Sequence, residues 1–195
     1  MRLLLALAIL ALSPGLAFAH TGIAHGAGFF HGIAHPVGGL DHVLAMLAVG
    51  VFAFVLGGRA LWLVPLSFVG AMVAGFGLGI AQVQLPFVEL AIALSIVAIG
   101  GAAALGRPMP VGAAMALVGV FAVFHGHAHG AEMAESADGL TYALGFVTAT
   151  ALLHLTGLAA AFGAAHLAGR FGGTAARLAG GAFAIAGLGI LAGWL

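Results

Sequence analysis

The chain has 195 residues, of which 64% are hydrophobic and only 5% are charged, with five acidic and five basic side chains. Soluble domains carry about 25% charged residues, so this composition excludes a soluble globular protein. The apolar runs are continuous over about 20 residues, which is the length that a membrane-spanning helix needs, and they lack the alternating pattern of a membrane β-barrel. The sequence therefore predicts an all-α integral membrane protein whose main partner is the lipid bilayer.

Two residue types are absent, and each absence excludes a class of chemistry. The chain has no cysteine, so a disulfide framework, a thiolate metal site and a redox thiol are excluded. It also has no lysine, because all five basic residues are arginines. A retinal protein with a Schiff-base lysine is therefore excluded. No basic patch indicates a nucleic acid partner.

The N-terminus reads as a secretory signal peptide. Arg2 precedes a short apolar core, Ser13-Pro14-Gly15 interrupts it, and Ala17-Phe18-Ala19 fits the A-x-A cleavage pattern. We expect residues 1–19 to be removed, which makes His20 the first residue of the mature chain. The alternative is an uncleaved segment that adds a seventh hydrophobic helix. Both versions place His20 and the residues after it outside the cytoplasm.

Six membrane helices are predicted after this segment, and residues 20–37 are too polar to span a bilayer. The expected helices cover residues 38–57, 60–81, 86–105, 110–126, 139–162 and 174–194. No connection between them is long enough to fold separately, so residues 20–195 are predicted to form a single polytopic domain.

The arginines indicate how the helices are oriented. Arg59, Arg107, Arg170 and Arg177 all fall in or beside the connections on one side of the membrane, and excess arginine marks the cytoplasmic side. The mature N-terminus and the C-terminus are then periplasmic. The predicted location is the cytoplasmic (inner) membrane of a bacterium.

Most of the ionisable side chains fall at the opposite, outer side. Charged groups in a membrane are costly, and they are a functional-site hypothesis by default. Imidazole together with carboxylate suits the borderline divalent ions Ni²⁺, Co²⁺, Zn²⁺ and Cu²⁺. Pro36 and Gly38-Gly39 allow an irregular start to the first helix, which would turn His35 back toward it. The predicted metal ligands are His35, Asp41, His42, His125, His127, His129 and Glu132.

Secondary or transit ligands are expected at His20, His31, Met46, Glu89 and His154. His154 lies about 14 residues below the outer end of its helix, or roughly 21 Å, past the bilayer midplane. It could pass the ion inward with Thr150, Met46 or Glu89 as partners. The alternative is a structural histidine that donates a hydrogen bond to a backbone carbonyl. If cleavage follows Ala19, the His20 imidazole and the free α-amine could chelate a metal ion together. The alternative is that this terminus is simply solvated. Met46 could equally be a core residue that only packs against its neighbours. Ser67 and Ser95 are isolated, and we expect their hydroxyls to contribute to helix packing.

The motifs His35-x5-Asp41-His42 and Phe124-His125-Gly126-His127-Ala128-His129-Gly130-Ala131-Glu132, with the stretch from Tyr142 to His154, resemble the HupE/UreJ family of hydrogenase and urease accessory membrane proteins. The resemblance covers essentially the whole mature chain. It implies a nickel permease that serves NiFe hydrogenase or urease maturation, with the two motifs carrying the metal. Its partners would be cytoplasmic nickel-insertion accessory proteins. Cobalt or other divalent ions are the alternative cargo.

Three functions other than transport are compatible with histidines in a membrane protein. A periplasmic metal sensor or chaperone would bind the ion without passing it inward. A haem-binding protein would need a histidine pair such as His42 and His154, and the depth estimate places these two near opposite faces. An intramembrane metalloenzyme is disfavoured because no His-Glu-x-x-His motif is present. We therefore expect no enzyme activity and no permanent cofactor, only the transported ion.

Overall fold

The structure, a computed structural model, describes residues 27–133 and 139–195, and every regular element in these ranges is helical. The signal-peptide segment, His20, His25, Glu135 and Asp138 lie outside the described residues. The elements are α2 (Ala27–Gly38), α3 (Leu40–Leu56), α4 (Ala60–Ile80), α5 (Val88–Leu105), α6 (Val111–Ala131), α7 (Gly139–Ala168), the 3-10 turn η1 (Gly169–Phe171) and α8 (Gly172–Leu191).

Helices α3 to α8 correspond in order to the six predicted segments, and two of them differ in length. Helix α6 continues past the expected end at 126 to Ala131, and α7 continues past 162 to Ala168. The segment before α3 also differs from the expectation, because residues 27–38 form helix α2. Twelve residues rise only about 18 Å, so α2 alone is too short to cross a bilayer.

Four helical stretches in the described ranges are long and apolar enough to span a membrane. They are Ala60–Ile80, Val88–Leu105, Val111–Ala131 and the 53-residue stretch Gly139–Leu191, which contains both α7 and α8. The pair formed by α2 and α3 would count as a fifth span, broken by a bend of 84°. The protein is therefore a multi-pass membrane protein.

Small residues set how closely the helices approach. Helix α4 packs along α6, α5 packs along α8, and α7 packs on both α2 and α3. A side chain at Gly126 would collide with the backbone carbonyl of Met72, and one at Gly75 would collide with that of Val123. Close backbone approach of this kind is the usual basis of helix association in lipid. It fixes α6, which carries three histidines, against α4.

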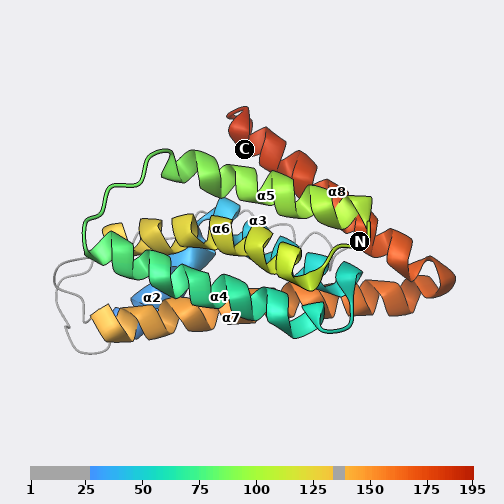
Figure 1. Ribbon diagram of the computed structural model, residues 1–195, viewed down its shortest axis with the longest axis horizontal. Helices are drawn as coiled ribbons and strands as arrows, with labels where there is room; N and C mark the ends of the chain where they lie inside the picture. The colour runs from blue at the N-terminus through green and yellow to red at the C-terminus, as the bar shows by residue number, and fades with distance from the viewer. Residues whose placement is uncertain (1–26, 134–138) are drawn as a thin grey trace, which may run out of the picture.

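The connections segregate to two ends of the bundle. The turns α3–α4, α5–α6 and α7–α8, which contain or adjoin the four arginines, lie at the right of Figure 1. The α4–α5 loop, the end of α6 and the start of α7 lie at the left. The end of α6 carries the second histidine motif, so the histidines of this motif and the arginines occupy opposite ends of the molecule.

Candidate metal site

The sharp break between α2 and α3 builds the first half of the site. Helix α2 ends at Gly38, and Gly39 has the extended backbone that starts α3 in a new direction. The 84° bend folds His35 back over the first turn of α3, which carries Asp41 and His42. A cavity of about 450 Å³ opens at this corner, lined by His31, Ala34, His35, Gly38, Gly39, Asp41 and His42. The sequence expectation that Pro36 and the glycines would redirect His35 matches this geometry.

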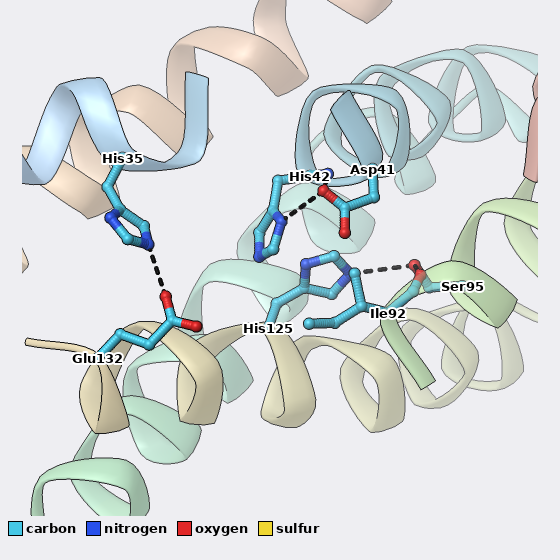
Figure 2. A network of polar contacts seen from close by, with 7 residues as sticks. All are labelled: His35, Asp41, His42, Ile92, Ser95, His125 and Glu132. Carbon is cyan, nitrogen blue, oxygen red and sulfur yellow. Dashed lines mark hydrogen bonds and ion pairs between the residues drawn. The ribbon is translucent and has the colours of Figure 1, made fainter. Parts of the chain in front are cut away.

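Helix α6 supplies the second half of the site. Because residues 125–131 are helical and do not form a loop, residues four apart share a face. His125 and His129 accordingly face α3 together. The His42 ring centroid lies 5.0 Å from that of His125 and 4.6 Å from that of His129. His42 therefore stands between two imidazoles of α6, and Figure 2 shows it beside His125.

His42, His125 and His129 form a histidine cluster, and the residues at its outer edge are partly exposed. His35 Nε2 lies 2.8 Å from Glu132 Oε2, and their side chains are 35% and 55% exposed. This contact joins α2 to the end of α6 (Figure 2). The His35 ring also lies 4.8 Å, centroid to centroid, from that of His129. His35 and Glu132 thus form an accessible outer layer over the buried imidazoles.

Hydrogen bonds decide which nitrogen of His42 is free. Asp41 Oδ1 accepts from the His42 backbone N–H at 2.8 Å and lies 3.0 Å from its Nδ1. A carboxylate only accepts, so Nδ1 carries the proton. His42 Nε2 is left buried and bonded to no described residue. A carboxylate behind an imidazole is the usual arrangement around a metal-binding histidine.

A hydrogen bond also fixes which ring nitrogen of His125 carries the proton. Ser95 donates its hydroxyl to the carbonyl of Ile92 at 2.6 Å, and its oxygen lies 3.0 Å from His125 Nε2. Ser95 has one proton to give, so it accepts from Nε2–H and leaves Nδ1 unprotonated. That Nδ1 is buried without a partner among the described residues. In Figure 2 the unbonded nitrogen of His125 lies on the side of its ring that is nearer His42.

His129 adds a third unbonded imidazole. Neither of its ring nitrogens is hydrogen-bonded to a described residue, although the side chain is only 1% exposed. Unbonded ring nitrogens of three neighbouring histidines, His42, His125 and His129, are therefore buried close together. Within residues 27–133 and 139–195, no three His, Asp or Glu side chains are yet arranged so that they could hold a metal ion. The rings would have to rotate inward to form a closed coordination shell.

Three predicted residues form no hydrogen bond with the described residues of this cluster. His127, two positions from its neighbours on a helix, faces the other side, and its Nε2 donates to the Val83 carbonyl at 2.6 Å. Glu89 is exposed in the first turn of α5 and bonds to none of the described histidines. Met46 is fully buried in the apolar core. The expectation that His127 would join the other two histidines depended on a loop, and the helix separates them.

His154 lies close to the cluster. The Phe68 ring contacts both His125, at 5.5 Å between centroids, and His154, at 5.0 Å. His154 therefore lies beneath the cluster with one aromatic ring in contact with both histidines.

Two contributing residues were missed or misread from the sequence. Ser95 was interpreted as a packing hydroxyl, yet it fixes the tautomer of His125. Tyr142, buried at the start of α7, has its ring 6.1 Å from that of His31 and 6.3 Å from that of His35. The sequence signal that could have identified both residues is that each is a polar side chain in an otherwise apolar stretch of helix.

Comparison with known proteins identifies the family. A sequence profile described as HupE / UreJ protein matches residues 7–190. The chain belongs to the HupE/UreJ family. It is 46% identical to the protein HupE of Rhizobium leguminosarum bv. viciae over 188 residues, which cover 96% of this chain and 95% of that protein. No solved structure matches the chain. Proteins of the HupE/UreJ family are accessory permeases and not enzymes, so the metalloenzyme alternative is excluded.

Proposed function

We propose that this HupE/UreJ protein carries Ni²⁺ from the periplasm into the cytoplasm, where accessory proteins insert it into NiFe hydrogenase or urease. The observation that carries the proposal is the clustering of three imidazoles, from His42, His125 and His129, each of which has a buried ring nitrogen that bonds to no described residue. Imidazole nitrogen is a preferred donor for nickel and its neighbours in the first transition series. Co²⁺, Zn²⁺ and Cu²⁺ share this preference and are the competing cargoes.

The proposed membrane arrangement has six spans after a cleaved signal peptide, with both mature ends in the periplasm of the inner membrane. Two features support it. The 53-residue stretch Gly139–Leu191 would extend about 80 Å as one helix, more than twice the hydrocarbon thickness. The turn at η1 lets it cross twice, as α7 and α8. The arginines lie at the end opposite the histidine cluster, which supports an outer position for the cluster by the positive-inside rule.

In the proposed mechanism, the ion is captured at the rim and passed to the buried imidazoles. Glu132 and His35 are exposed enough to meet a hydrated ion and replace some of its water. His42, His125 and His129 then provide nitrogen donors one layer below. Asp41, 26% exposed and bonded to His42, offsets part of the charge of the ion. His20 remains a proposed capture ligand at the start of the mature chain.

Nickel uptake by reconstituted vesicles tests the proposal. We expect vesicles with the wild-type protein to take up radiolabelled Ni²⁺, and His42→Ala to reduce uptake roughly tenfold or more, since even residues behind a metal ligand are worth 10–100-fold in affinity. His166→Ala is the matched control because His166 is exposed near the end of α7. Wild-type protein that binds Ni²⁺ but takes up none would contradict transport and favour the sensor or chaperone.

A further inference from the structure

His154 is a buried histidine that the outer cluster does not use. Its side chain is 2% exposed, and neither ring nitrogen is hydrogen-bonded to a residue that the structure describes. A polar group without a partner in the membrane interior costs several kcal/mol by order of magnitude. An apolar side chain of similar size at this position would avoid that cost. The unbonded nitrogens therefore indicate that this position holds a ligand in some state of the protein.

A second donor atom lies on the helix that faces His154. Phe68, whose ring contacts His154 edge-on at 86°, is followed one turn later on α4 by Met72. Thr150, one turn before His154 on α7, places its hydroxyl 3.5 Å from the Met72 sulfur. Met72 and Thr150 are both fully buried. The His154 imidazole contacts Phe68, one turn from Met72, and the Met72 thioether contacts Thr150, one turn from His154, so both donors lie at the contact between α4 and α7.

We propose that His154 and Met72 form a second, inner coordination position for the transported divalent ion, beside Phe68, whose ring contacts both His125 and His154. This inference rests on the proposed permease function. Transport needs a position that the ion enters readily and leaves readily. The acidic side chains that the structure describes are Asp41, Glu89 and Glu132, and none bonds to His154 or Met72. Neutral donors alone hold a dication weakly, as an intermediate position requires.

The donor pair also gives this position a chemical preference. Thioether sulfur and imidazole nitrogen suit borderline and softer ions, whereas Mg²⁺ and Ca²⁺ require oxygen ligands. The outer cluster has carboxylates that could capture a hard ion. The inner position contains no carboxylate, and it would therefore reject the hard ions that the rim admits. Discrimination against abundant Mg²⁺ is assigned to His154 and Met72 on this basis.

Two nearly isosteric replacements of His154 test the metal role separately from packing. Leucine and methionine have similar volume, and exchanging them is usually tolerated in a core. We expect His154→Leu to lower nickel uptake at least tenfold while nickel affinity at the outer cluster stays within twofold of wild type. His154→Met should restore most of the uptake because it returns a donor atom. Normal uptake by His154→Leu would overturn the proposal, and so would equal failure of both variants.

X-ray absorption at the nickel edge gives an independent test on the purified full chain. The protein has no cysteine, so sulfur bonded to nickel can come only from methionine. With nickel in excess we expect a sulfur shell that disappears in Met72→Leu and persists in Met115→Leu, a control on α6. Absence of sulfur in the wild type, or its persistence in Met72→Leu, would overturn the inner position. Failure of the proposed function itself would instead appear as absent uptake by wild-type vesicles.

Discussion

Ser95 determines which nitrogen of His125 faces the cluster, because its hydroxyl is already donated to Ile92. Removing that hydroxyl leaves Nε2–H without an acceptor and frees the ring to change tautomer. We predict that Ser95→Ala weakens nickel binding roughly 10–100-fold, the usual effect of losing the group that orients a metal ligand. Ser95→Thr keeps the hydroxyl and should bind nickel like the wild type. A nickel titration in which Ser95→Ala binds normally would contradict the assigned tautomer.

His127 and His129 should respond to replacement in opposite ways. His127 donates a hydrogen bond to Val83, so His127→Leu should cost about 1 kcal/mol of stability and leave nickel binding unchanged. His129 has no bonded nitrogen among the described residues, so His129→Leu should preserve stability and weaken nickel binding at least tenfold. Thermal unfolding and nickel titration of the two variants check this. Equal loss of nickel binding in both variants would contradict the prediction that His129 binds nickel and His127 does not.

The predicted residues that the structure brings together and those that it separates differ in how much their positions depend on the local conformation. His35, Asp41 and His42 could be placed together because Pro36 and two glycines are strong signals of a broken helix start. His127 was grouped with His125 because the glycine-rich segment was read as a loop. Tertiary packing against α4 keeps that segment helical, and in a helix alternate residues face apart.

At the scale of the elements, α2 was the helix that sequence reasoning did not find. It is short, contains Pro36 and several polar or small residues, and has no propensity signal strong enough to predict it alone. Its stability comes from α7, where side chains at Gly32 or Gly145 would collide with backbone carbonyls of Tyr142 and Phe29. This close contact holds His35 in place, and tertiary packing of this kind cannot be read from local sequence.

A matched pair of glycine substitutions in α7 tests the role of this contact. We predict that Gly145→Ala pushes α2 away, lowers stability by about 1–3 kcal/mol as overpacking usually does, and weakens nickel binding as much as His35→Ala does. Gly163→Ala, in the same helix with open space around it, should change neither property appreciably. Thermal unfolding and nickel titration distinguish them. Normal nickel binding by a folded Gly145→Ala protein would show that α2 does not position the site.

For the whole molecule, composition and continuous apolar runs of about 20 residues were sufficient to predict an all-α membrane protein, since a chain with so few charges has no soluble alternative. The order of the helices α3 to α8 also followed from the breaks at glycine, proline and arginine. Which helices touch could not be predicted, because membrane helices have similar apolar faces all round. The pairing of α4 with α6, and hence the position of Met72 near His154, depends on where small residues allow close approach.

The orientation in the membrane can be tested with single cysteines, because the natural chain contains none. Gln84, exposed in the α4–α5 loop, and Gly173, exposed at the start of α8, lie at opposite ends. We predict that a membrane-impermeant thiol reagent added to intact spheroplasts labels Gln84→Cys and labels Gly173→Cys only after the membrane is opened. The reverse labelling pattern would place the histidine cluster inside the cell and contradict import from the periplasm.

The central claim is that nickel binds at His42, His125 and His129, and anomalous diffraction from crystals of the nickel-loaded full chain tests it most directly. The account predicts that the strongest nickel peak lies within bonding distance, about 2 Å, of His42 Nε2, with at least one of the α6 histidines His125 and His129 also bonded to it. A nickel peak bonded to His127 or His166, with none beside His42, would contradict the account.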